Sequence, residues 1–287
     1  MTISIASGKG GVGKTTVAVS LALSLEEDIQ FLDCDVEEPN AHIFLKPTIK
    51  ETIKVSTPIP KIDETKCNFC GRCSEICAYN AIAVIRPSDN KKGSILVFPN
   101  LCHSCGGCSI LCPQEAIREI NREIGILKIG NVNSIQFIYG YLNIGEAMSP
   151  PVIKAVKKKA EEYKKGKEKI VIIDAPPGTS CPVIEAVKDS DFCILVTEPT
   201  PFGLNDLILA VEVVRKLKIP LGVIVNRFDI GDRGVENFCN SENIPILMRI
   251  PFKREIASGY SKGIPLIEVL PEYKKYFQDI FRRLRNG

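Results

Sequence analysis

Short apolar segments alternate with helical patterns at both ends of this chain. The apolar segments are rich in Ile, Val, Leu and Phe, and each ends at a polar residue or a turn. They lie at residues 2–6, 29–33, 169–174, 191–197, 221–226 and 246–250. Helical patterns begin near Lys14, Pro150, Pro182, Leu204, Gly234 and Glu272. Strands that are apolar on both faces and alternate with helices predict an α/β domain with a doubly wound, mostly parallel sheet.

The pattern changes between residues 58 and 127, where an internal repeat replaces this alternation. A shift of 35 residues superimposes eight cysteines on one another, and it also superimposes Gly71 on Gly106. Duplication of this kind predicts a pseudo-twofold unit in which both halves contribute to one core. We therefore expect a discontinuous domain of residues 1–57 and 128–287, with residues 58–127 inserted as a second domain.

Composition and charge narrow the possible classes of protein. The chain has 287 residues, 45% of them hydrophobic and 25% charged, which is enough for two cores. It opens on a strand-like segment without a charged leader, and no apolar run approaches the roughly 18 residues of a membrane span. A net charge of +3, with every cysteine counted as neutral, gives no support for a nucleic-acid partner. We expect a cytoplasmic protein, whose 12 cysteines are poor candidates for disulfides and good candidates for metal ligation or redox work.

A glycine-rich loop follows the first predicted strand and leads into a helical pattern. It reads Gly8-Lys9-Gly10-Gly11-Val12-Gly13-Lys14-Thr15-Thr16. Glycines let consecutive backbone N–H groups converge on phosphate oxygens, and a helix N-terminus adds partial positive charge. The motif predicts that the whole loop binds ATP, with Lys14 on the β- and γ-phosphates and Thr15 on Mg²⁺. A glycine-rich turn without a ligand is the alternative, and it does not explain why all these elements lie between a strand and a helix.

This loop resembles the deviant Walker A motif of the MinD/ParA superfamily, which reads KGGVGKTT as residues 9–16 do. The resemblance implies an ATP-dependent sandwich homodimer in which Lys9 reaches the phosphates bound by the partner subunit. Three more segments match in the family's order, at residues 31–35, 172–178 and 223–227. Together with the loop they extend over the chain outside the insert.

The matching segments imply further site residues. Asp35 takes the family's position for the carboxylate that orients the attacking water, and Asp174 takes the Walker B position, which holds Mg²⁺ through water. Asp33 is a second candidate for the metal, whereas Asn226 is implied to read the adenine edge with Arg227 beside it. For a single aspartate at a strand end, a helix cap or a turn former is the alternative. The implied catalytic set is Lys9, Lys14, Asp35 and Asp174.

The insert carries two cysteine runs with the spacing of iron–sulfur ligands. They read Cys67-x-x-Cys70-x-x-Cys73-x-x-x-Cys77 and Cys102-x-x-Cys105-x-x-Cys108-x-x-x-Cys112. Three thiolates at this spacing bind one cubane, and the fourth ligates the other cluster. Cluster 1 would take Cys67, Cys70, Cys73 and Cys112. Cluster 2 would take Cys102, Cys105, Cys108 and Cys77. Two zinc sites are the alternative, although zinc sites usually pair separated C-x-x-C knuckles.

The insert resembles the bacterial two-cluster ferredoxins, which implies an α+β ferredoxin-like domain with two [4Fe-4S] clusters. It departs from the motif at Ala78, where a proline is usual. One functional hypothesis is an ATPase that couples nucleotide-dependent dimerisation to electron transfer through both clusters. A second is an iron–sulfur cluster carrier of the Mrp type, which holds a transferable cluster on a C-x-x-C pair; the chain has no such pair outside the insert. A third is a nucleotide-switched positioning protein, which only the resemblance to the ATPases supports. The expected partner is a redox protein or a client protein.

Three remaining features each allow a functional and a structural interpretation. Residues 154–169 are rich in lysine, which suggests either DNA contact or the solvated face of an amphipathic helix, and interleaved glutamates favour the second. The amphipathic segment from Tyr273 to Leu284 suits packing onto the domain better than membrane contact. Cys181 follows Asp174 by seven residues and is either a helix-start residue or a metal or redox ligand.

Overall fold

The computed structural model describes residues 1–88, 92–164, 166 and 168–286. The chain forms two compact units, which we call unit 1 and unit 2. Unit 1 comprises Met1–Ile53, Leu127–Tyr141 and Val152–Gly287, and unit 2 comprises Lys54–Ile126 and Leu142–Pro151. Unit 2 is therefore slightly longer at its start than the predicted insert, and it also includes the segment 142–151. Within unit 2 this segment is held by Arg122, which donates to Glu146 Oε1 at 2.6 Å.

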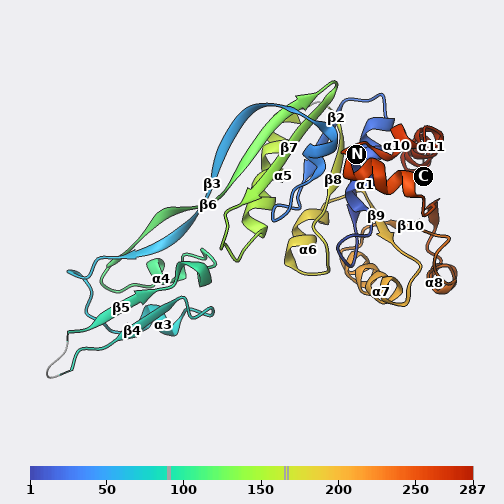
Figure 1. Cartoon of the computed structure of the whole chain (residues 1–287). Coiled ribbons are helices and arrows are strands. Elements are labelled where there is room, and N and C mark those ends of the chain that lie inside the picture. The colour runs from blue at the N-terminus through green and yellow to red at the C-terminus, as the bar shows by residue number, and fades with distance from the viewer. Residues whose placement is uncertain (89–91, 165, 167, 287) are drawn as a thin grey trace. The chain divides into compact units, whose positions relative to one another are not determined.

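A sheet with the strand order β11-β10-β9-β1-β8-β2-β7-β6-β3 forms the centre of the fold (Figure 1). Six of its strands correspond to the predicted segments: β1 (Thr2–Ala6), β2 (Ile29–Asp33), β8 (Ile170–Asp174), β9 (Phe192–Thr197), β10 (Leu221–Asn226) and β11 (Ile246–Ile250). These strands pair in parallel. The prediction of an α/β fold with a mostly parallel sheet is thus confirmed.

Three strands of the sheet are absent from the sequence-based prediction. They are β3 (Thr48–Ile62), β6 (Ile117–Val132) and β7 (Ile135–Leu142). Strand β7 continues the parallel sheet beside β2. A two-residue turn at Asn133, whose φ is 49°, joins β6 to β7 as a hairpin. Strands β3 and β6 pair although they are far apart in the sequence. Both also carry many polar residues, so the hydrophobic pattern did not indicate them.

Helices of unit 1 lie between the strands and after the last of them. They are α1 (Lys14–Ser24), α2 (Ala41–Leu45), α5 (Pro150–Lys164), α6 (Cys181–Val187), α7 (Pro201–Lys216), α8 (Gly234–Ser241), α9 (Arg254–Ser261), α10 (Leu266–Val269) and α11 (Glu272–Asn286). Helix α7 begins three residues before the predicted Leu204, because the Thr200 side chain accepts a hydrogen bond from the Gly203 N–H at 3.0 Å and caps the helix there. Helix α6 begins one residue before the predicted Pro182, and α2, α9 and α10 were not predicted.

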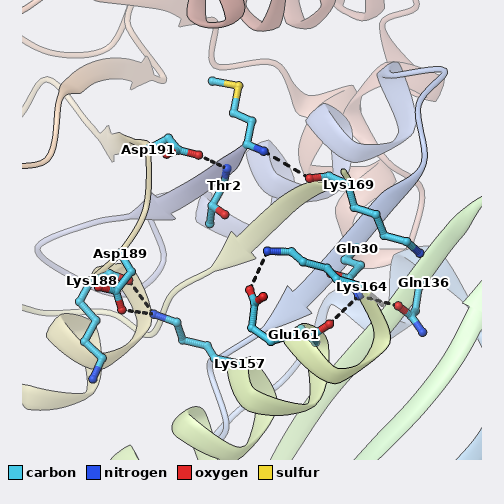
Figure 2. A network of polar contacts seen from close by, with 12 residues as sticks. Thr2, Gln30, Gln136, Lys157, Glu161, Lys164, Lys169, Lys188, Asp189 and Asp191 are labelled. Carbon is cyan, nitrogen blue, oxygen red and sulfur yellow. Dashed lines mark hydrogen bonds and ion pairs between the residues drawn. The ribbon is translucent and has the colours of Figure 1, made fainter. Parts of the chain in front are cut away.

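Buried polar contacts join α5 to the elements around it (Figure 2). Gln30 on β2 donates from Nε2 to Gln136 Oε1 on β7 at 2.7 Å and to the Ala160 carbonyl on α5 at 3.0 Å. Lys157 donates from Nζ to the Lys188 carbonyl at 2.6 Å, just beyond the end of α6. The lysines of α5 were expected on a solvated face. Lys157 departs from that expectation because the last carbonyls of a helix require donors.

The C-terminal helix α11 packs onto the domain. Its apolar side chains at Tyr273, Phe277, Ile280 and Phe281 are buried in the core cluster that also contains residues of α1. Gln278 donates from Nε2 to the Ser24 carbonyl at the end of α1, at 2.9 Å. The apolar face of α11 is therefore used for packing onto the domain. None of the described helices is long and apolar enough to cross a membrane.

Unit 2 repeats one local conformation in its two cysteine runs. It contains the short helices α3 (Arg72–Glu75) and α4 (Gly107–Ile110), a 3₁₀ turn at Pro99–Leu101, and the antiparallel pair β4 (Ile82–Ile85) and β5 (Ser94–Val97). Positive φ angles recur at positions 35 residues apart: Phe69 and Ser104, Gly71 and Gly106, Asn80 and Glu115. The repeat in the sequence is therefore also a repeat in backbone conformation.

Candidate functional site

The glycine-rich loop bends tightly between β1 and α1. Gly11 and Gly13 have φ angles of 77° and 97°, which a residue with a Cβ rarely adopts. A Cβ at Gly8 would overlap the backbone of Asp206 on α7, so glycine is required there for close packing. The Ser7 hydroxyl donates to the Lys9 carbonyl at 2.6 Å and steadies the start of the loop.

The loop forms one wall of a cavity of about 340 Å³ in unit 1. Lys14 and Thr15, at the first turn of α1, line this cavity and are both buried. The predicted residues on its wall are Gly10, Gly11, Gly13, Lys14, Thr15, Thr16, Asp35, Asn226 and Arg227. Gly8 and Val12 support the loop from behind, where Val12 is buried. The structure thus brings together residues from three of the matched sequence segments.

Asp174 lies at the carboxyl end of β8, and its side chain has no hydrogen-bond partner within the described residues. Both of its carboxylate oxygens are buried without a donor. Burial raises the Asp174 pKa from 3.8 to about 7, an effect that the Thr15 hydroxyl and the Lys14 ammonium reduce. Buried oxygens without donors suit a cation or its hydration water. The residues present therefore fit Mg²⁺ held by Thr15 and, through water, by Asp174.

Asp33 is in register with Asp174 on the neighbouring strand but has a different environment. Its two oxygens accept hydrogen bonds from the backbone N–H groups of Asp35 and Ala41, both at 3.1 Å. Burial, together with the charge of Asp174, raises the Asp33 pKa well above its ordinary value. Of the two interpretations of this residue, the turn former fits its contacts: Asp33 shapes the loop that carries Asp35 and anchors the start of α2.

Asp35 lines the cavity from that loop. Its carboxyl group is partly buried, and burial raises its pKa from 3.8 to about 6, against the lowering effect of Lys14. At neutral pH most of the population is therefore ionised, and the carboxylate can accept a proton or orient a water molecule.

The free energy of unfolding should depend on pH through Asp174. A carboxyl whose folded pKa is raised binds its proton more tightly in the folded state, so stability is highest at low pH and falls as pH rises from about 4 to about 7. We expect Asp174→Asn to flatten this slope, by on the order of a few kcal/mol across the window. Urea unfolding at several pH values measures it. Asp189→Asn, at an exposed carboxyl, is the control, and an unchanged slope in Asp174→Asn would contradict the assignment.

Asn226 at the end of β10 holds the glycine-rich loop. Its Nδ2 donates to the Val12 carbonyl at 2.9 Å, and its Oδ1 accepts from the Arg227 N–H at 3.0 Å. A Cβ at Gly13 would lie 2.6 Å from the same Nδ2. In this arrangement the Asn226 amide group is hydrogen-bonded to the glycine-rich loop. Its implied contact with an adenine edge stays a prediction.

Asn226→Asp is expected to loosen the loop. The substitution keeps the Oδ1 acceptor but places an oxygen in front of the Val12 carbonyl, which costs about 1–3 kcal/mol. Thermal unfolding should show a lower melting temperature and a smaller stabilisation by Mg-ATP. Asn240→Asp, on the exposed face of α8, serves as the matched control. Equal melting temperatures and equal Mg-ATP stabilisation in both variants would show that the loop does not depend on this amide.

Lys9 lies beside the cavity and does not line it. Its Nζ forms an ion pair with Glu198 Oε2 at 3.8 Å, and Glu198 Oε1 pairs with Arg227 at 2.8 Å. Glu198 is 8% exposed, so this small network is shielded from solvent on the Glu198 side. The implied action of Lys9 on a partner subunit remains a prediction.

One wall of the cavity was not predicted. This wall is formed by Phe252 and Lys253 after β11, and by Ile256 and Tyr260 on α9. Phe252 is positioned by its N–H, which donates to Asp229 Oδ1 at 2.7 Å. No contiguous motif marks this segment, and only the helical spacing of its apolar residues would have indicated α9.

Two cavities of unit 2 are each lined by four cysteines. The first is lined by Cys67, Cys70, Cys73 and Cys112. The second is lined by Cys77, Cys102, Cys105 and Cys108. The fourth cysteine of each run thus lies with the first three of the other run. Across the described part of the chain, no group of three or more His, Cys, Asp or Glu side chains is placed to hold a single metal ion.

Backbone N–H groups point at cysteine sulfurs in the same way in both runs. The donor–acceptor pairs are Phe69–Cys67 at 3.3 Å, Ser104–Cys102 at 3.4 Å, Ala81–Cys77 at 3.2 Å and Ala116–Cys112 at 3.3 Å. Hydrogen bonds of this kind stabilise thiolates, which are the form that binds metal. Burial raises the pKa of the Cys108 thiol to about 11, so ligation there has to displace a proton. Four thiols around each cavity fit the ligand set of a [4Fe-4S] cluster.

The remaining cysteines lie in unit 1. Cys34, Cys193 and Cys239 are buried, and burial raises the pKa of the Cys193 thiol to about 12 and that of Cys239 to about 11. They are packing residues. Cys181 is exposed and is the first residue of α6. This position agrees with its interpretation as a helix-start residue.

Solved structures share the fold of this chain. The septum site-determining protein MinD of Pyrococcus horikoshii, complexed with Mg-ADP, matches with a TM-score of 0.59 at 21% identity, covering 100% of this chain and 97% of that chain. The cell division ATPase MinD of Pyrococcus furiosus matches with a TM-score of 0.59 at 19% identity, covering 99% and 98%. These likenesses agree with the α/β fold of this chain.

Sequence comparisons extend the relation to whole chains. An uncharacterized protein of Methanocaldococcus jannaschii is 34% identical over 99% of this chain and 96% of its own length. An iron-sulfur cluster carrier protein of Pyrococcus horikoshii is 26% identical over 96% of this chain and 83% of its own length. The family model of the CobQ/CobB/MinD/ParA nucleotide binding domain matches residues 3–266. With its glycine-rich loop, Asp174 and parallel sheet, this chain belongs to the CobQ/CobB/MinD/ParA family of nucleotide-binding domains.

Proposed function

We propose that this protein is a Mg²⁺-dependent ATPase that couples nucleotide-dependent dimerisation to electron transfer through two [4Fe-4S] clusters in unit 2. One observation carries the proposal. The same chain has a cavity lined by the glycine-rich loop and two further cavities that are each lined by four cysteines.

Unit 1 supplies the groups that phosphoryl transfer requires. Lys14 and the loop N–H groups would compensate phosphate charge, and Thr15 and Asp174 would hold Mg²⁺. Asp35, ionised at neutral pH, would orient the attacking water. Phosphoryl transfer needs positioning and charge compensation more than covalent chemistry, so this set is sufficient. The bound Mg-ADP named for the MinD structure of Pyrococcus horikoshii supports the choice of nucleotide.

Dimerisation would bring Lys9 into use. In the single chain Lys9 is paired with Glu198 at 3.8 Å, a long and partly exposed contact. Ion pairs of this kind contribute about 0–1 kcal/mol, so Lys9 can exchange Glu198 for a phosphate of a partner subunit at little cost. Arg227 would keep Glu198 paired after that exchange.

Unit 2 supplies the redox part. When bound, each cluster would accept and release one electron, and the eight cysteines would hold the clusters with the backbone N–H groups directed at their sulfurs. This assignment makes unit 2 the ferredoxin-like insert that the sequence predicts, with four thiolates for each cluster. The physiological redox partner would be a protein that takes electrons from one of these clusters.

Chain connectivity supports coupling between the two activities. Asp33 anchors both the loop of Asp35 and the start of α2, and β3 begins at Thr48, three residues after α2 ends at Leu45. The chain then passes from unit 1 into unit 2 within β3. A movement of the Asp35 loop on ATP binding would therefore be transmitted to β3 through a short segment.

A cluster carrier is the second candidate, favoured by the name of the Pyrococcus horikoshii relative. A carrier needs ligands from which a cluster can leave, such as a C-x-x-C pair at a dimer interface, and unit 1 has no such pair. Its exposed cysteine, Cys181, would supply only one thiol per chain. The ligand arrangement therefore favours resident clusters.

The first experiment is anaerobic purification followed by iron, sulfide and zinc analysis and ATPase assays with the clusters oxidised and reduced. We expect iron and acid-labile sulfide in equal amounts, little zinc, and ATPase rates that differ between the redox states. Equal rates would argue against coupling, and zinc without sulfide would refute the cluster assignment. Incubation with an apo-acceptor protein separates the candidates, because ATP-dependent loss of iron to the acceptor would favour a carrier.

A further inference from the structure

The two cysteine runs place different side chains at one equivalent position. Phe69 and Ser104 each lie two residues after the first cysteine of their run. Both have a left-handed backbone, with φ angles of 54° and 56°. Both also donate their N–H to the sulfur of that first cysteine, at 3.3 Å and 3.4 Å. Because the backbone is the same, the two positions differ in what the side chain offers to the adjacent cavity.

Phe69 offers hydrocarbon to the first cavity. Its ring packs against Gly93, where a Cβ would lie 2.6 Å from a ring carbon, and it belongs to the wall formed with Cys67 and Cys70. A phenyl ring has no polar hydrogen to donate. From this position, cluster 1 would receive only the backbone N–H.

Ser104 carries a hydroxyl and lies at the second cavity. The residue belongs to the wall formed with Cys102 and Cys105. Its Oγ is buried and has no hydrogen-bond partner among the residues that the structure describes. A buried hydroxyl that lacks a partner is unfavourable, so an acceptor is expected beside it. The sulfur atoms of a bound cluster are such acceptors.

We propose that the Ser104 hydroxyl donates a hydrogen bond to a sulfur of cluster 2 and thereby raises the reduction potential of that cluster. This inference rests on the proposed function, because it requires a resident cluster. Reduction adds negative charge to the cluster and its sulfurs, so a hydrogen-bond donor stabilises the reduced form more than the oxidised form. Ser104 is thus a tuning residue, and it makes the two equivalent positions electronically different.

Charged side chains also border both cavities. Arg72 borders the first and Glu119 the second, and both are exposed. Solvent and salt screen exposed charges, whereas the Ser104 hydroxyl is shielded from water. Because these charges stay in place when residue 104 is changed, the shift measured on substitution isolates the hydroxyl.

The test is a redox titration of the anaerobically purified full-length protein, followed by EPR. In Ser104→Ala we expect one of the two midpoint potentials to become more negative, with the other midpoint, the iron and sulfide content and the ATPase rate unchanged. Ser104→Asn, which tolerates the left-handed backbone and keeps a side-chain donor, should restore the midpoint. The step that shifts should be the one that disappears in Cys77→Ser, a variant that lacks a ligand of cluster 2.

The control is Phe69→Leu, which changes the equivalent position of the first half and should leave the Ser104-sensitive midpoint in place. An unchanged pair of midpoints in a fully loaded Ser104→Ala protein would overturn the inference while leaving the proposed function intact. A shift that Ser104→Asn does not restore would also overturn it, because loss of packing would then explain the effect. Failure of the proposed function is seen separately, as wild-type protein without acid-labile sulfide.

Discussion

Cys112→Ser is expected to remove the cluster that Cys67, Cys70 and Cys73 hold, although Cys112 belongs to the other cysteine run. The physical reason is the crossed arrangement of the two cavities, in which Cys112 lines the first and Cys77 the second. A cluster that loses one of four thiolates is held weakly or degraded. Iron and sulfide should therefore fall by about half, and one of two EPR signals should be lost.

The matched variant is Cys77→Ser, which should remove the other EPR signal with a similar loss of iron. Cys181→Ser, at an exposed thiol of unit 1, should leave both signals unchanged. A comparison with Cys108→Ala decides the connectivity. If Cys112→Ser and Cys108→Ala abolish the same signal, each run holds its own cluster and the crossed arrangement is wrong.

Lys14→Ala is expected to reduce ATP hydrolysis by on the order of 10²–10³-fold, the loss seen when one preorganised transition-state donor is removed. Lys14 lies at the first turn of α1, is buried to 7% exposure and lines the cavity beside Thr15. A fixed ammonium in such a site acts on phosphate charge far more strongly than it would in water. Steady-state phosphate release and nucleotide titration measure the loss of turnover and of binding.

Lys262→Ala provides the control, because Lys262 is an exposed lysine of unit 1 that does not line this cavity. Lys9→Ala gives a second comparison: it should keep nucleotide binding by the single chain but lose hydrolysis that depends on a dimer. Iron content should be the same in all three variants, since none of these lysines lies in unit 2. Wild-type turnover in Lys14→Ala would contradict the assignment of the phosphate site.

Asp33 and Asp174 show what a pattern of residues cannot decide. Both follow apolar strands, and the two strands are neighbours in the sheet. Only the folded chain places two backbone N–H groups on Asp33 and none on the oxygens of Asp174. Asp174 is therefore the better metal candidate, because its oxygens lack the hydrogen-bond donors that Asp33 has.

The sequence by itself determined those features that depend on residues close together along the chain. The glycine-rich loop of residues 8–16 carries its own conformational requirements, and the helix that begins at Lys14 follows from the pattern after it. Short apolar strands likewise indicated a parallel sheet, because burial on both faces leaves a clear signal. Cysteine spacing predicts two groups of four thiols, each with three cysteines of one run and the fourth of the other.

What only the tertiary structure decided depends on residues that are distant in the sequence. Strands β3 and β6 are neighbours in the sheet although residues 63–116 separate them in the sequence, and half-exposed strands carry a weaker pattern than buried ones. Phe252 and Tyr260 line the same cavity as the glycine-rich loop, although they are far from it in the sequence. Likewise, Ser104 is one more polar residue until folding buries its hydroxyl without a partner, because burial is a property of all the surrounding segments together.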